Sequence, residues 1–430
     1  MASDGVRRSK LAAVIRVSSG NFIEMYDFMV YGYYAKYIGD AFFPVASPFA
    51  SLMLSLVTFG AGYLMRPLGA VVLGAYIDRR GRRAGLLLTL TLMAVGTLTI
   101  ALTPGYAAIG LAAPLIVVFG RLLQGLSAGV ELGGVSVYLA EIATPGRRGF
   151  YCAWQSASQQ VAVMFAALIG VVLSFFVTPT AMSIWGWRIP MLIGCMIIPF
   201  VLWLRGSLEE TEIFLRRRDQ KTTTELFKLL ALNWKVVIIG MMMSIFTTTA
   251  FYLITAYTPT FGREALKLSA LEVMLVTLFV GASNFIWLPI GGALSDRHGR
   301  RKLLYAIPAL ALVTAYPVMA WLVAEPTFAK LLLAELWISL MFGLYNGAMV
   351  PRLAELVDPR VRTAAFALAF SLATAIFGGF TPAIATFLIH ATGNKAAPAL
   401  WLMLAAFISL VGTFLSHRRG IGSHEHFEGN

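Results

Sequence analysis

The chain has 430 residues, of which 58% are hydrophobic and 13% are charged, and its formal net charge is +13. A soluble globular protein carries roughly 25% charged residues, so this composition excludes an ordinary soluble domain and indicates transmembrane helices. The basic residues lie in short segments between apolar runs, which is typical of cytoplasmic loops rather than of a face that binds nucleic acid. The sequence shows no nucleophile elbow, phosphate loop or metal-ligand cluster. We therefore expect no enzyme, no cofactor and no metal site.

Twelve apolar runs are long enough to cross about 30 Å of hydrocarbon at about 1.5 Å per residue. A basic arm precedes the first run, as in a signal peptide. However, Glu24 and Asp27 interrupt that run without a small-residue cleavage site before them, so we expect an uncleaved span. The predicted spans are approximately 14–38, 49–73, 84–104, 112–139, 151–177, 187–205, 235–258, 269–293, 302–323, 331–351, 363–390 and 397–416.

One long polar segment lies in the middle of the chain and divides it into halves. We expect six-helix bundles at 1–205 and 234–416, a cytoplasmic linker at 206–233 and a cytoplasmic tail at 417–430. Lys and Arg concentrate in alternate loops, which places both termini in the cytoplasm.

A charged motif with the same pattern occurs in each half, at 74–83 and 292–301, and we expect it in a short loop outside the lipid. In the first copy, Asp78 can face the N-terminus of a neighbouring helix, where the helix dipole favours an anion. Arg82 or Arg83 can pair with Glu141, which begins a second duplicated segment. The corresponding residues of the second copy are Asp296, Arg300, Arg301 and Glu355.

The twelve spans, the duplicated halves and the pattern Gly-x-x-x-Asp-Arg-x-Gly-Arg-Arg resemble the major facilitator superfamily. Segments similar to its metabolite–proton symporter branch are 20–28, 66–69, 121–125, 186–190 and 207–211. Segments similar to bacterial citrate–proton and tricarballylate–proton symporters are 129–138, 154–160, 283–291 and 370–379.

The resemblance implies an all-α membrane protein with twelve transmembrane helices in two pseudo-symmetric six-helix bundles. It implies uptake of a tricarboxylate, citrate or tricarballylate, with protons across the bacterial cytoplasmic (inner) membrane. It also implies a role for the duplicated motif, whose cytoplasmic contacts would hold the outward-open state and break when the carrier turns inward.

Ionisable side chains inside lipid spans cost about 2.5–3.5 kcal/mol each on insertion scales, so each is a site hypothesis. In the first span, Asn21, Glu24, Asp27 and Tyr31 follow helical spacing on one stripe. A carboxyl in a low-dielectric cavity can exchange a proton near neutral pH, as a proton-coupled carrier requires. We expect proton coupling at Glu24, Asp27 and, in the fourth span, Glu131; structural ion pairs are the alternative.

Arg121 is the first candidate to bind a substrate carboxylate, since a guanidinium binds carboxylate with two parallel hydrogen bonds and keeps its charge. The alternative is a pair with Glu24, Asp27 or Glu131 that holds helices together, and substrate could also compete for that pair. Arg66 is either a site residue or extends toward the cytoplasmic surface. The polar residues expected to complete the cavity, or to form hydrogen bonds between helices, are Gln124, Gln155, Gln159, Asn284 and Asn346.

These features predict proton-coupled uptake of a citrate-like organic anion by alternating access. H⁺ is the expected coupling ion, and Na⁺ stays open. The alternatives are another organic anion such as a dicarboxylate or shikimate, an osmolyte, and a membrane sensor that transports nothing. We expect a monomer surrounded by lipid, without a nucleic-acid partner.

Overall fold

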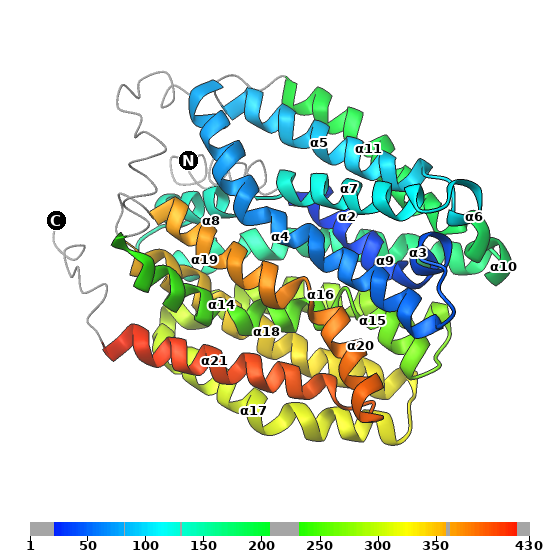
Figure 1. Cartoon of the computed structure of the whole chain (residues 1–430). Coiled ribbons are helices and arrows are strands. Elements are labelled where there is room, and N and C mark those ends of the chain that lie inside the picture. Colours follow the sequence, from blue (N-terminus) through cyan, green and yellow to red (C-terminus); the bar gives the residue numbers. More distant parts are fainter. Residues whose placement is uncertain (1–20, 81, 130, 207–231, 358–361, 419–430) are drawn as a thin grey trace, which may run out of the picture.

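The computed structural model describes residues 21–80, 82–129, 131–206, 232–357 and 362–418. Every regular element in these ranges is a helix (Figure 1). The helices follow one another as twelve rods, some of them broken, which confirms the predicted all-α fold.

The first half forms six rods. Its elements are α2 (Asn21–Tyr33), α3 (Ala35–Phe42), α4 (Pro48–Arg80), α5 (Arg82–Leu102), α6 (Tyr106–Ile109), α7 (Ala112–Ser127), α8 (Glu131–Ile142), α9 (Arg148–Phe176), α10 (Pro179–Ala181), the π-helical turn η1 (Met182–Gly186) and α11 (Arg188–Gly206).

The second half forms the other six. Its elements are α14 (Trp234–Ile254), α15 (Thr258–Thr260), η2 (Phe261–Ala265), α16 (Ala270–His298), α17 (Arg300–Ala324), α18 (Phe328–Leu356), α19 (Arg362–Ala373), η3 (Thr374–Gly378), α20 (Thr381–Thr392) and α21 (Pro398–Arg418).

Eight helices among the described residues are long and apolar enough to span a membrane, and a ninth span results if the bent pair at 179–197 counts as one. The shorter apolar helices Leu87–Leu102 and Ala112–Ser127 fall below that length. Several rods that we expected to be continuous are interrupted. The first breaks at Tyr34, the fourth between α7 and α8, the seventh between α14 and α15, and the eleventh at η3.

Proline accounts for two of the breaks, because it lacks an N–H group and restarts a helix in its first turn. Pro259 lies in the first turn of α15, and Pro382 lies in the first turn of α20. Pro67, by contrast, lies inside the uninterrupted α4. The context of each proline therefore decides where a rod bends.

The duplicated motif does not lie in a loop, contrary to our expectation. In the second copy, α16 continues to His298 and α17 starts at Arg300, so Gly299 alone links them. Gly299 has φ +84°, which an L side chain rarely adopts, and glycine permits this one-residue corner. The first copy likewise lies in the ends of α4 and α5, on either side of residue 81.

The two halves lie side by side in Figure 1, the blue-to-cyan helices against the yellow-to-red ones. Their main seam is between α9 and α16, and a second contact joins α4 to α19 and η3. At one end of the seam, a Cβ added to Gly292 would lie 2.3 Å from the carbonyl oxygen of Gly149. The backbones of the halves therefore touch at the face that carries the duplicated motif, which we call the motif face. Most of the predicted linker (206–233) and tail (417–430) lies outside the described residues.

Candidate functional site

A buried ion pair joins the first two rods. Arg66 on α4 donates a hydrogen bond through Nη2 to Oε1 of Glu24 on α2. The relative exposures of Arg66 and Glu24 are 2% and 5%, so neither side chain reaches the surface. The guanidinium carbon also lies 5.2 Å from the ring centre of Tyr63. The idea that Arg66 extends toward the cytoplasm is therefore wrong, and the residue belongs to the interior of the first half.

Asp27, one turn after Glu24, belongs to a separate network. Its Oδ2 accepts a hydrogen bond from Thr97 on α5. Thr97 accepts one from Nε2 of Gln124 at 2.9 Å, and Oε1 of Gln124 accepts one from Nη1 of Arg121 at 2.7 Å. The chain of bonds connects an acid on α2 to a guanidinium on α7. Thr97 was missed from the sequence, because a single threonine in an apolar helix carries no pattern.

Arg121 is completely buried and is surrounded by aromatic rings. Its guanidinium carbon lies 4.5 Å from the ring centres of both Phe28 and Tyr31 and 5.2 Å from that of Phe59. Its Nη2 donates to the carbonyl oxygen of Phe59 at 3.2 Å. Cation–π contacts of this kind are attractive and strengthen when water is excluded.

Among the described residues, Arg121 forms no ion pair with an acid, and its Nε has no hydrogen-bond partner. The alternative of a direct pair with Glu24 or Asp27 is thus absent: Glu24 pairs with Arg66, and Asp27 is connected to Arg121 through Thr97 and Gln124. The arrangement leaves a buried cation with a donor available for an anionic group.

The second half closes over this site with aromatic side chains. Tyr252 on α14 places its ring centre 5.1 Å from that of Tyr63 and 6.2 Å from that of Phe59. A Cβ added to Gly379, just after η3, would lie 2.6 Å from the Tyr63 ring. Both halves therefore contribute to the enclosure of the arginine site.

The predicted amides lie in three different places. Asn284 on α16 donates to Gln160 on α9 at 3.1 Å and accepts from Ser339 at 2.7 Å, so it bridges the two halves. Asn346 accepts from Thr247 at 2.9 Å inside the second half. Gln155 accepts from its neighbour Ser156.

Gln159 is also buried, and of these five predicted amides Gln124 is the one that hydrogen-bonds to Arg121 within the described chain. Gln160 was missed from the sequence, because a helical stripe alone does not identify which of two adjacent glutamines faces the other half.

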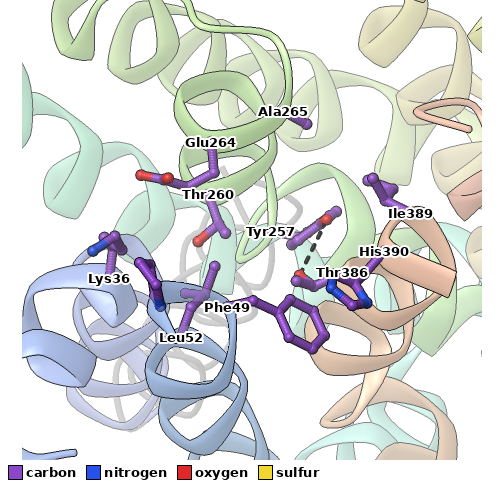
Figure 2. Close-up of a pocket in the computed structure, with 11 residues that line it drawn as sticks. Lys36, Phe49, Leu52, Tyr257, Thr260, Glu264, Ala265, Thr386, Ile389 and His390 are labelled. Atoms are coloured by element: carbon purple, nitrogen blue, oxygen red, sulfur yellow. Dashed lines mark hydrogen bonds between the residues drawn. The ribbon is translucent and has the colours of Figure 1, made fainter. Parts of the chain in front are cut away.

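A cavity of about 260 Å³ opens between the halves at the face opposite the duplicated motif (Figure 2). Phe49 stacks on His390 with ring centres 3.7 Å apart, and Thr386 donates to the hydroxyl of Tyr257 at 3.2 Å. The residues that line this cavity are Lys36, Pro48, Phe49 and Leu52 of the first half and Tyr257, Thr260, Glu264, Ala265, Thr386, Ile389 and His390 of the second. None of the predicted ligand residues lines this cavity.

The motif face is held by polar contacts between the halves. Both carboxylate oxygens of Asp296 accept backbone hydrogen bonds at the start of α9, from Gly149 at 2.8 Å and Phe150 at 3.0 Å. Arg148 of the first half lies 4.0 Å from the carboxylate of Glu355, which also forms an ion pair at 2.7 Å with Arg300 inside the second half. An acid of the motif thus caps a helix N-terminus of the other half, where the dipole favours it.

The remaining predicted residues are placed as follows. Arg301 lies over the ring of Tyr305 at 5.9 Å rather than in an ion pair of the described chain. Tyr31 contacts Arg121 and directs its hydroxyl to the carbonyl oxygen of Ser55 at 3.4 Å. The side chains that lie outside the described part of the structure are those of Asn21, Asp78, Arg82, Arg83, Glu131 and Glu141.

Comparison with known proteins identifies the family. Residues 17–382 match the Major Facilitator Superfamily. The chain belongs to this superfamily. It is 59% identical to a citrate-proton symporter of Salmonella typhi over 95% of this chain and 94% of that protein. It is 57% identical to a citrate-proton symporter of Klebsiella pneumoniae, over 96% and 93% of the two chains.

More distant relatives of this major facilitator protein agree on the architecture. It is 31% identical to an alpha-ketoglutarate permease of Escherichia coli K12, over 96% of this chain and 95% of the permease. The crystal structure of a D-xylose-proton symporter matches with a TM-score of 0.75 at 17% identity, over 95% and 97% of the two chains. That likeness establishes the fold alone. The relatives are named as transporters and the helices are apolar, so the chain is a multi-pass membrane transporter and not an enzyme.

Proposed function

We propose that this major facilitator protein takes up citrate together with protons across the bacterial cytoplasmic membrane, with both termini inside the cell. Two relatives that share more than half of its residues over nearly the whole chain are named citrate-proton symporters, which supports the substrate. The structural observation that carries the proposal is the buried Arg121, whose Nε has no partner among the described residues. A small organic anion with several carboxylates suits such a site.

The two arginines suggest how protons and substrate are coupled. Glu24 neutralises Arg66, and Asp27 is connected to Arg121 through Thr97 and Gln124. A proton on Glu24 removes the charge that holds Arg66, and a substrate carboxylate then replaces it. Asp27 acts in the same way on Arg121. Protons and substrate therefore bind together at the centre of the first half.

The charge of the substrate provides the reason for symport. Moving one negative charge inward against a membrane potential of about 100 mV costs about 2.3 kcal/mol. A citrate trianion would meet this cost three times, and each proton that enters with it offsets one charge. H⁺ is the coupling ion in this proposal, and neither Na⁺ nor a cofactor is required.

Alternating access then follows from the contacts between the halves at the two faces. The contacts that Asp296 and Glu355 make with the start of α9 hold the motif face, which we assign to the cytoplasm, and they part when the halves rock. The opposite cavity is the entrance from outside. The protein works as a monomer in lipid, since the proposed path runs between the two halves of one chain.

Transport assays in sealed vesicles test this proposal. Purified protein in liposomes should accumulate labelled citrate when the outside is more acidic, and a protonophore should abolish the accumulation. Replacing Na⁺ by K⁺ should leave the rate unchanged. Absence of citrate uptake, or uptake that is indifferent to the pH gradient, would overturn the proposal.

Competition by unlabelled acids defines the substrate. Citrate and tricarballylate should compete at similar concentrations, because both carry three carboxyls. Malate, α-ketoglutarate, shikimate and betaine should compete weakly. Stronger inhibition by α-ketoglutarate would favour a dicarboxylate carrier, the runner-up suggested by the 31% identical permease.

A further inference from the structure

The second half contains a buried acid that the proposed coupling does not use. Glu335 lies in the outer part of α18 with 5% exposure. Its Oε1 accepts a hydrogen bond from Thr258 on α15 at 2.7 Å. Its Oε2 is buried without a hydrogen-bond partner in the described chain. Glu335 was missed from the sequence, because it lies near the start of the predicted span at 331–351 and not near the middle of the membrane.

The surroundings of Glu335 offer nothing to balance a negative charge. No Lys, Arg or His of the described residues forms an ion pair with it. The titratable groups that face it are Tyr33 on α2, whose hydroxyl donates to the carbonyl oxygen of Val163 at 3.4 Å, and Tyr257 before α15. The other neighbours are apolar side chains of α14, η2, α17 and α18.

An ionised carboxylate buried in this way would pay several kcal/mol of desolvation without a cation to offset it. The packed arrangement therefore suits the neutral acid. Ionisation of Glu335 would favour any movement that lets water reach it.

Glu335 also lies close to a path from outside. It borders a small cavity of about 10 Å³ that is otherwise lined by apolar side chains and by Tyr257. Tyr257 lines the large outer cavity as well (Figure 2), so the two cavities share this residue. Thr258, the next residue, holds Glu335 at the break between α14 and α15. The part of the seventh rod that binds the acid is thus the part that lines the entrance.

We propose that Glu335 is a proton-binding site that controls closure of the outer entrance. When the entrance is open, water reaches Glu335 past Tyr257 and the carboxylate takes a proton from it. The neutral acid then packs against Thr258, and α15 closes the entrance. On reopening, the proton returns to outside water, so Glu335 adds a dependence on external pH without adding to the protons carried inward. This inference rests on the proposed orientation, with the duplicated motif inside the cell.

A distance measurement on purified protein, without citrate, tests the proposed role of Glu335. Spin labels at Ala46, between α3 and α4, and at Lys395, between α20 and α21, report the separation of the two halves at the outer face. Both sites are exposed, and the native Cys152 and Cys195 are replaced by alanine first. A buried glutamic acid can keep its proton up to about pH 8–9. Raising the pH from about 6 to about 9 should therefore ionise Glu335 and increase the fraction of long distances.

Three variants make the test specific. Glu335→Gln imitates the neutral acid and keeps an acceptor for Thr258, so its distances should stay short at both pH values. Thr258→Val removes the hydrogen bond and should increase the long distances at low pH. The matched control is Glu325→Gln, which neutralises an acid that is 82% exposed on the same face, and it should behave like the unmodified protein.

The outcomes separate this inference from the proposed function. Glu335→Gln with the same pH response as the parent protein, or a parent protein without any response, would overturn the role of Glu335. In liposomes, Glu335→Gln should lower the external-pH dependence of citrate exchange while the ratio of protons to citrate stays unchanged. A changed ratio would also contradict the inference. Failure of citrate transport alone would leave the distance result intact.

Discussion

Arg66 and Arg121 are both buried near the centre of the first half, but their charges are balanced in different ways. Arg66 has a carboxylate in direct contact, whereas Arg121 has the carbonyl oxygen of Phe59, aromatic faces and a glutamine. Removing one member of a buried ion pair costs about 3–5 kcal/mol, because the other charge is left without a partner. Arg121 has no such partner among the described residues. Substitution should therefore affect substrate binding at Arg121 and both stability and coupling at Arg66.

Arg121→Gln should weaken citrate binding by about 10- to 100-fold, the equivalent of one charged hydrogen bond or slightly more. Isothermal titration calorimetry on the purified protein measures it. Arg188→Gln is the matched control. Arg188 lies at the face opposite the duplicated motif, where it donates hydrogen bonds to the carbonyl oxygens of Ala101 and Thr103 and lies over the ring of Trp187. An unchanged affinity for Arg121→Gln would make Arg121 a structural residue.

Glu24→Gln should separate exchange from accumulation. The amide cannot release a proton, so exchange of citrate across the membrane should continue while accumulation driven by a pH gradient falls about tenfold. The variant should also unfold at a lower temperature, and the double variant with Arg66→Met should regain part of that loss, because no charge is then left alone. Accumulation that stays at the level of the unmodified protein would contradict a coupling role for Glu24.

At the scale of helices, the arginine site depends on how closely α4 and α7 approach. A Cβ added to Gly125 would lie 1.6 Å from the carbonyl oxygen of Gly62, and one added to Gly129 would lie 2.3 Å from that of Arg66. The glycines on this stripe of α7 and in the link after it therefore let the two backbones touch, as expected for helix packing in membranes. This contact sets the distance between Arg66 on α4 and Arg121 on α7.

Gly125→Ala should destabilise the protein by about 1–3 kcal/mol, because the added methyl group forces α4 and α7 apart. Thermal unfolding in detergent, followed by fluorescence, measures the loss. Leu115→Ala on the same helix is the control: the leucine is 69% exposed toward lipid, so its truncation should change the unfolding temperature little. Equal effects of the two substitutions would show that the α4–α7 contact is not tight.

At the scale of the whole molecule, the two faces are closed by different means. The motif face has backbone contact at Gly149 and Gly292 together with the ion pairs around Glu355. The opposite face keeps a cavity and has fewer charged contacts between the halves, among them a hydrogen bond from Arg263 to Tyr37 at 2.6 Å. The structure thus represents a state that is closed at the motif face and partly open at the other.

Gly292→Ala should shift the molecule toward opening at the motif face, because the methyl group would overlap the carbonyl oxygen of Gly149. Spin labels at the exposed Pro145 and His298 should show a larger fraction of long distances than in the parent protein. Ala293→Val, at the neighbouring exposed position, should leave the distances unchanged. A distribution that is identical for Gly292→Ala would contradict the role of this contact in closure.

Local sequence patterns were sufficient for much of the architecture. Apolar runs of membrane-spanning length predicted the twelve rods, because the length of a run depends only on consecutive residues. The repeated motif predicted two related halves, because a repeat is visible in the order of residues itself. Acids and arginines inside apolar runs likewise identified Glu24, Asp27, Arg66 and Arg121 as unusual, since lipid penalises their charge wherever they lie.

Partners across space were decided only by the tertiary structure. The order of residues does not show that Glu24 pairs with Arg66 or that Asp27 is connected to Arg121 through Thr97. It also does not show that Gln160, and not Gln159, binds Asn284. Glu335 is the sharpest case, because its lack of an ion pair in the described chain is a property of the residues packed around it. Hydrophobic periodicity determines which segments cross the membrane, whereas the pairing of polar groups depends on how helices distant in the chain are packed together.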